Sequence, residues 1–147
     1  MPRVLIGLTI LAVLVQLIRP ALPQAFGRLT PDEPIALVDR LAAELPADGC
    51  CARVLNEQVW GGYLAYRLSD RVRTAMDGRL EIRSGETWSE YFDLLHGEGD
   101  PARQLGEAGV EWALVGADRN QLLAALDAAG WQVVERSPHG VLLRAPT

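Results

Sequence analysis

The sequence contains no lysine: all 14 basic residues are arginine, against 19 carboxylates, so the formal net charge is −5. This balance argues against broad electrostatic attraction to nucleic acid, and no nucleic-acid partner is predicted. There are only two cysteines and two histidines. The cysteines are adjacent, at Cys50 and Cys51, which excludes a structural zinc site of the CxxC type. No metal ligands and no cofactor are predicted.

Motifs that bind nucleotides or activate nucleophiles are also missing. There is no GxGxxG, Walker A or HExxH sequence and no GxSxG elbow. These absences count against a self-contained enzyme, and no catalytic residue is assigned. An active site built on a carboxylate pair is still left open. The 147 residues, of which 49% are apolar and 22% charged, suffice for one folded domain and not for two.

The longest apolar run lies near the N-terminus. Residues 4–18, VLIGLTILAVLVQLI, carry no charge and lie between Arg3 and Arg19. As a helix they span about 22 Å, short of the hydrocarbon core of about 30 Å, so flanking residues must contribute. We predict one transmembrane helix over residues 1–22 and a linker over 23–30. A cleaved signal peptide and a buried soluble helix are the alternatives. The prediction implies a single-pass protein of the cell membrane.

Residues 31–147 are predicted to form an extracytoplasmic domain in which strands alternate with helices. A capping box at residues 30–33 begins the first helix, which ends near Pro46. The remaining expected elements are strands at 53–56, 72–76 and 112–115, helices at 59–68, 87–96, 101–108 and 118–129, and a hairpin of 131–135 with 141–144. The fold class is therefore α/β, layered, with a mixed, mostly parallel sheet and a C-terminal antiparallel hairpin, preceded by the transmembrane helix.

Polar residues follow the first two strands, at positions 56–57 and 77–79. If these strands are parallel neighbours, their carboxyl ends adjoin, and ligands of α/β sheets bind at such ends. The polar side chains could hydrogen-bond a sugar's hydroxyls while two aromatic side chains of the next helix stack on its ring. The predicted ligand-binding residues are Asn56, Glu57, Trp60, Tyr63, Asp77 and Arg79.

A structural interpretation of the same residues is that Asp77 and Arg79 form an ion pair that fixes a turn, while Asn56 caps the following helix. Arginines are also concentrated between residues 67 and 83, where five stand against three carboxylates. Their guanidinium groups could bind lipid phosphate or pyrophosphate, or could simply form a solvated face. The weaker anion-binding candidates are Arg67, Arg71, Arg73 and Arg83.

The adjacent cysteines have no second pair with which to form a redox CxxC motif. Outside the cytoplasm they could cross-link two chains. Alternatively, one packs inward as a small apolar residue and the other stays free. Their role is left open.

Residues 56–64, NEQVWGGYL, and 76–79, MDGR, resemble a known pattern. They are similar to the C-terminal extracytoplasmic domain of bacterial polytopic membrane proteins of the GT-C glycosyltransferase-like group. The likeness extends to residues 109–114, GVEWAL, and to the closing hairpin after Gly130.

Relatives of this kind are similar to lipid-linked sugar transferases, whose catalytic carboxylates lie in a loop between early transmembrane helices. This chain supplies no such loop, so the resemblance implies that Asp77 is not a catalytic acid. It implies a membrane-anchored, non-catalytic accessory or acceptor-recognition module, glycosyltransferase-like only as part of a larger polytopic chain. The implied partners are the lipid bilayer, a saccharide or polyprenyl-phosphate-linked sugar, and a polytopic membrane protein. The alternative is a protein-protein interaction module that docks on a membrane partner without a small-molecule ligand.

Overall fold

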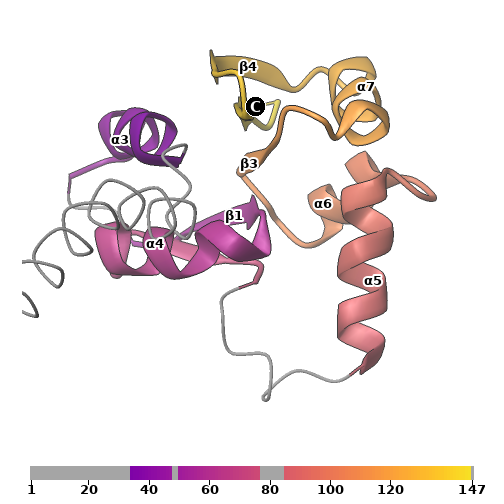
Figure 1. Cartoon of the computed structure of the whole chain (residues 1–147), viewed down its shortest axis with the longest axis horizontal. Helices are drawn as coiled ribbons and strands as arrows, with labels where there is room; N and C mark the ends of the chain where they lie inside the picture. The colour runs from indigo at the N-terminus through magenta and orange to yellow at the C-terminus, as the bar shows by residue number, and fades with distance from the viewer. Residues whose placement is uncertain (1–33, 48–49, 77–84, 147) are drawn as a thin grey trace, which may run out of the picture. The chain divides into compact units, whose positions relative to one another are not determined.

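The computed structural model describes residues 34–47, 50–76 and 85–146 (Figure 1). The chain divides into two units, residues 1–32 and 33–147, and every described element belongs to the second. The predicted transmembrane helix, the linker and the capping box lie outside the described residues. Among the residues that are described, no helix is both long and apolar enough to cross a membrane.

Five helices of the second unit alternate with five strands, broadly as the sequence predicts. The helices are α3 (Pro34–Glu44), α4 (Gln58–Leu68), α5 (Gly85–His96), α6 (Pro101–Glu107) and α7 (Asn120–Ala128). The strands are β1 (Ala52–Asn56), β2 (Val72–Thr74), β3 (Trp112–Gly116), β4 (Gln132–Arg136) and β5 (Gly140–Arg144). Strand β2 ends at Thr74, two residues before the predicted end.

The five strands form one sheet in the order β2-β1-β3-β5-β4. Strand β1 is parallel to both β2 and β3, so the predicted parallel pairing of the first two strands is confirmed. Strand β5 is antiparallel to both β3 and β4, which confirms the C-terminal hairpin. The α/β class and the mixed sheet are as predicted, but half of the pairings are antiparallel because β5 inserts between β3 and β4.

Helices cover both faces of the sheet, giving three layers (Figure 1). The alternation of side chains along a strand divides the core. Val54 of β1 and Leu114 of β3 pack against α3 and α4, whereas Leu55 and Ala113 pack against α5, α6 and α7. Strand β3 is buried at every position, as its continuous apolar sequence predicts for a central strand.

Local signals fix the element ends. The Asp100 carboxylate accepts a hydrogen bond from the Arg103 backbone N–H at 3.1 Å, and Pro101 follows it, so α6 begins where the sequence predicts. Gly130 adopts a φ of 82°, which glycine tolerates without steric cost and which ends α7.

The C-terminal hairpin places β4 at the edge of the sheet. Its register shifts between Val133 and Glu135, which is a β-bulge or similar irregularity. In the connecting turn, the Ser137 hydroxyl accepts a hydrogen bond from the Gly140 N–H at 3.0 Å. This turn fixes the point at which β5 enters the centre of the sheet.

Candidate functional site

The carboxyl ends of β1 and β3 form a topological switch point. The two strands are parallel neighbours. The chain leaves β1 toward α4 on one face of the sheet and leaves β3 toward α7 on the other. Loops that diverge in this way open a crevice at which α/β proteins bind ligands. Two predicted residues, Asn56 and Glu57, lie at this point.

An ion pair joins the segments that follow these two strands. Arg119, which follows β3, donates hydrogen bonds from Nε to Glu57 Oε1 at 2.8 Å and from Nη2 to Glu57 Oε2 at 2.9 Å. The Gly116 N–H donates to Glu57 Oε1 at 3.0 Å. The side chains of Arg119 and Glu57 are 24% and 12% exposed, respectively. The hydrogen bond with Glu57 raises the pKa of Arg119. Both carboxylate oxygens of Glu57 therefore already have partners from within the domain.

Gly116 leaves room for this arrangement. A Cβ added there would collide with the Asp118 carboxylate and would lie 3.2 Å from Glu57 Oε1. The absence of a side chain therefore lets the loop after β3 close over the Glu57 carboxylate.

Asn56 links the ends of β1 and β2. Its side chain is fully buried and donates from Nδ2 to the carbonyl oxygens of Met76, at 2.7 Å, and Glu57, at 2.8 Å. Its Oδ1 accepts from the Met76 N–H at 3.4 Å. The structural interpretation in which Asn56 caps the next helix is wrong: Glu57 is the N-cap of α4 and makes no side-chain capping bond. The reason is that the amide is already engaged by the Met76 backbone.

Tyr91 of α5 completes this buried network. Its hydroxyl donates to the Asn56 carbonyl oxygen at 2.8 Å. Burial, and to a smaller extent the charge of Glu57, raises the pKa of the Tyr91 phenol. Neither Tyr91 nor Arg119 was among the predicted site residues. A signal existed for Arg119, because it follows a buried strand as Glu57 does.

The two predicted stacking residues lie on α4, but they are not equivalent. Trp60 is only 5% exposed and belongs to the core between α4 and the sheet. A Cβ added to Gly140 would lie 2.9 Å from its ring and 2.8 Å from Leu37 Cδ1, so the indole is packed closely against β5. Tyr63 is half-buried against the same core cluster. In this structure Trp60 packs inward instead of presenting a ring face at the surface.

The remaining predicted ligand-binding residues, Asp77 and Arg79, lie outside the described residues, as does Arg83. Met76 is described, is 1% exposed and is held by Asn56 at the carboxyl edge of the sheet.

Two of the described arginines of the anion-binding set already have partners within the domain. Arg67 pairs with Asp39 of α3 at 2.5 Å, and this hydrogen bond raises the pKa of Arg67. Arg71 donates from Nη2 to the carbonyl oxygens of Ala42 and Leu45, at 2.8 and 2.7 Å. Arg73 is exposed. Arg67 and Arg71 thus hold α3 against the α4–β2 region.

A cavity of about 750 Å³ begins beside Met76 and extends between α5 and α6. Its volume is in the range of small-molecule sites. Hydroxyl, carboxylate and amide side chains in its lining can exchange hydrogen bonds with a polar ligand. Its main polar lining residues are Thr87, Glu90, Tyr91, Asp93, Gln104 and Glu107.

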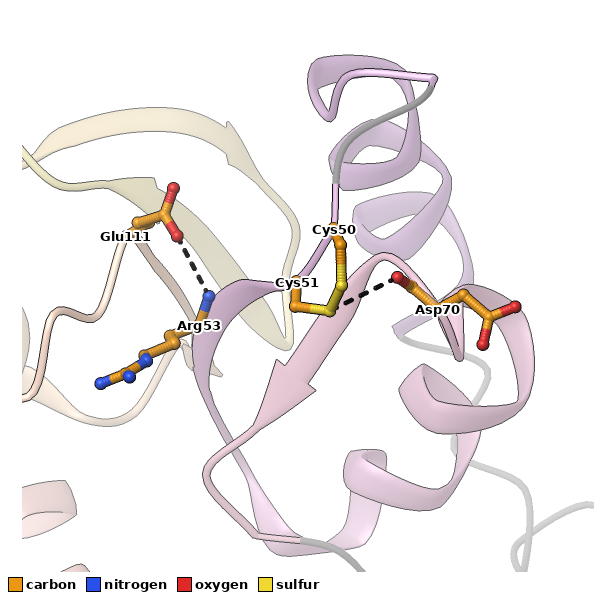
Figure 2. Close-up of a disulfide and its surroundings, with 5 residues drawn as sticks. All are labelled: Cys50, Cys51, Arg53, Asp70 and Glu111. Atoms are coloured by element: carbon orange, nitrogen blue, oxygen red, sulfur yellow. Dashed lines mark hydrogen bonds between the residues drawn. A yellow bond between two sulfur atoms is a disulfide. The ribbon is translucent and has the colours of Figure 1, made fainter.

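The opposite end of β1 carries a disulfide between Cys50 and Cys51 (Figure 2). The sequence left two possibilities open: a cross-link between two chains, or one cysteine packed inward and the other free. The pairing within one chain differs from both. The pairing is accompanied by a φ of 103° at Cys51, which the sequence does not indicate. A cavity of about 400 Å³ adjoins the pair.

The chain matches no protein-family model, no curated protein and no solved structure. The resemblance to the GT-C glycosyltransferase-like group therefore stays a prediction.

Proposed function

We propose that the domain is a non-catalytic recognition module for a saccharide or a polyprenyl-phosphate-linked sugar, held at the membrane by residues 1–22 and facing the extracytoplasmic side. In this proposal it serves as an accessory or acceptor-recognition part of a glycosyltransferase-like system. The observation that carries it is the cavity beside Met76, which Asn56 holds and which precedes Asp77 in the sequence.

The chemistry of the lining supports a polyhydroxylated ligand. The Glu90 carboxylate can accept hydrogen bonds from sugar hydroxyls, and the Gln104 amide can both donate and accept. In the proposal, Asp77 adds another acceptor and Arg79 supplies the bidentate donor that suits a phosphate. Asn56 holds Met76, and Glu57 holds the loop after β3. Trp60 and Tyr63 of α4 belong to the core on the other face of the sheet and do not line this cavity.

Equilibrium binding of the purified full chain to a glycan panel, and to vesicles that contain polyprenyl phosphate, tests the proposal. We expect Asp77→Ala, Arg79→Ala and Glu90→Gln each to weaken binding about tenfold, the equivalent of losing one well-formed hydrogen bond. Melting temperatures should stay within a few degrees. Arg136→Ala is the matched control because Arg136 is exposed on strand β4 and does not line the cavity. Equal binding by wild type and all three variants, or no binding at all, would contradict the proposal.

Membrane anchoring is tested separately. A C-terminal epitope tag on the chromosomal gene, with blotting of alkali-washed membranes, should give a band that stays in the membrane fraction. A band at the mass of 147 residues indicates an anchored module of this size. A band several times larger indicates the tail of a polytopic protein. A tag found wholly in the soluble fraction would contradict the anchor.

The second candidate function is docking on a membrane protein, and one observation favours it. Val59 and Tyr66 of α4 are 72% and 82% exposed. They lie seven residues apart, and hence on the same side of the helix. In co-purification from detergent-solubilised membranes, Val59→Ser with Tyr66→Ser should lose a docked partner, whereas Glu90→Gln should keep it.

A further inference from the structure

The disulfide between Cys50 and Cys51 joins neighbouring residues immediately before β1 (Figure 2). Cys50 is exposed and Cys51 is half-buried. The described cysteines are both in this bond. A reagent in solution can thus reach the pair from the Cys50 side.

This bond is poorly suited to stabilising the fold. A disulfide stabilises mainly by closing a loop of the unfolded chain, and the effect grows with the length of that loop. Here no residue lies between the two cysteines. The bond also accompanies a φ of 103° at Cys51, a backbone region that residues with a side chain rarely occupy. A covalent bond that contributes little to folding and holds an unfavourable conformation points to a chemical role.

The backbone after the pair is held independently of the disulfide. The Ala52 N–H donates to the Arg71 carbonyl oxygen at 3.0 Å. Arg53 exchanges two bonds with Glu111: its N–H donates to Glu111 Oε1 at 3.3 Å, and its carbonyl accepts from the Glu111 N–H at 3.0 Å. Opening the disulfide therefore leaves β1 attached to both neighbours.

The surroundings of the disulfide also suit the groups that form when it opens. Cys51 Sγ lies 3.7 Å from the Asp70 carbonyl oxygen (Figure 2), so a Cys51 thiol can donate a weak hydrogen bond there. The adjoining cavity of about 400 Å³ is lined by both cysteines and by Arg71, Glu111, Trp112 and Arg144. Arg144 lies over the Trp112 ring, 5.4 Å from its centroid. A small thiol can therefore enter beside the disulfide, where the guanidinium groups of Arg71 and Arg144 are accompanied by the carboxylates of Glu44 and Glu111.

We propose that Cys50 and Cys51 form a thiol–disulfide exchange site for small thiols. The incoming thiolate attacks Cys50 Sγ and forms a mixed disulfide, while Cys51 leaves as a thiolate, takes a proton from solvent and donates to the Asp70 carbonyl. A second thiolate attacks the sulfur of the bound small molecule. It releases the small-molecule disulfide and leaves Cys50 as a thiolate that solvent protonates. Two thiols are thereby oxidised and the cysteine pair is reduced.

This inference does not depend on the recognition function. Its test uses the purified full chain in buffers of reduced and oxidised glutathione, followed by acid quenching, alkylation and mass spectrometry. We expect the pair to interchange reversibly between disulfide and dithiol while the chain stays folded. The unfolding midpoint should change by only a few degrees. A bond that resists reduction until urea unfolds the chain would overturn the proposal, as would reduction that itself unfolds the chain.

Single-cysteine variants test the order of attack. In Cys51→Ser, oxidised glutathione should modify Cys50 rapidly. In Cys50→Ser, modification of Cys51 should be about tenfold slower because Cys51 is less exposed. The reverse order would overturn the assignment of Cys50 as the attacked sulfur.

A charge variant tests the cavity. Arg144→Gln should slow the reduction of the wild-type pair by glutathione about threefold, because it removes a positive charge from the lining. Reduction by the neutral thiol 2-mercaptoethanol should not change. Arg136→Gln, on the edge strand β4 and away from the cavity, is the control. Equal rates for both variants with glutathione would show that the thiol does not enter there.

Discussion

The two ends of strand β1 are stabilised in opposite ways. At its carboxyl end, Asn56 and Glu57 are engaged by hydrogen bonds from three separate parts of the chain, through Met76, Tyr91 and Arg119. At its amino end, a disulfide joins the adjacent residues Cys50 and Cys51 and borders an open cavity. The first end is therefore a shared support of the fold, whereas the chemistry of the second can change without loss of the fold. Four predictions test this contrast.

The largest effect is expected at Asn56. Replacing it with leucine leaves the buried Met76 carbonyl without its partner and places an apolar side chain where three hydrogen bonds were made. We expect a loss of about 3 kcal/mol in the free energy of unfolding. Urea denaturation followed by circular dichroism measures it. Asn120→Leu, at an exposed position of α7, is the control. A similar loss at both sites would remove the distinction between the two asparagines.

The next effect concerns the Glu57–Arg119 pair. Arg119→Gln or Glu57→Gln alone leaves one charge without its partner in a poorly exposed site, and each should cost about 2 kcal/mol. The double variant should cost less than the sum of the singles, because neither charge is then left unpaired. Strictly additive losses in urea denaturation would mean that the two residues act independently.

Tyr91→Phe should cost about 1 kcal/mol at neutral pH, because it removes the hydrogen bond to the Asn56 carbonyl. Since folding raises the pKa of Tyr91, its phenol stays protonated in the folded state where the unfolded chain has begun to ionise. The wild type should therefore lose stability as pH rises above the unfolded tyrosine value of about 10. The difference in melting temperature between the wild type and Tyr91→Phe should therefore decrease as the pH rises above this value. A difference in melting temperature that does not change with pH would contradict the raised pKa of Tyr91.

The smallest effect is expected at the opposite end of β1. Reducing the Cys50–Cys51 disulfide should change the free energy of unfolding by less than about 1 kcal/mol, since the closed loop is the shortest one available and the φ of Cys51 opposes it. Urea denaturation of the oxidised and reduced chains gives the difference. A loss as large as that of Asn56→Leu would mean that both ends of β1 support the fold equally.

Much of the fold could be predicted from local patterns. The apolar runs of β1 and β3, the Asp100–Pro101 start of α6 and the hairpin after Gly130 all have local causes. The position of β5 was not predicted, although its GVLLR sequence is buried at four of five positions, a burial typical of an inner strand. The more polar β4 suits an edge, and this difference between the two hairpin strands was the available signal.

The candidate site was less predictable because its partners are distant in the sequence. The sequence indicated that Asn56 and Glu57 follow a strand, but Glu57 meets Arg119 from 62 residues away, and Asn56 meets backbone atoms of Met76. The burial of Trp60 depends on Gly140, which no local pattern brings near it. The pairing of adjacent cysteines requires a positive φ at Cys51, for which the residue type gives no warning.

The two borders of the sheet also restrict how this chain can associate with others. Strand β2 has only three residues, and β4 combines a register irregularity with the charged pair Glu135 and Arg136. Short, irregular and charged edges are poor templates for adding another strand. Growth into fibrils through either border is thereby discouraged in a chain that is 49% apolar. A physiological partner is therefore expected to bind the helical layers or the strand ends and to leave the sheet at five strands.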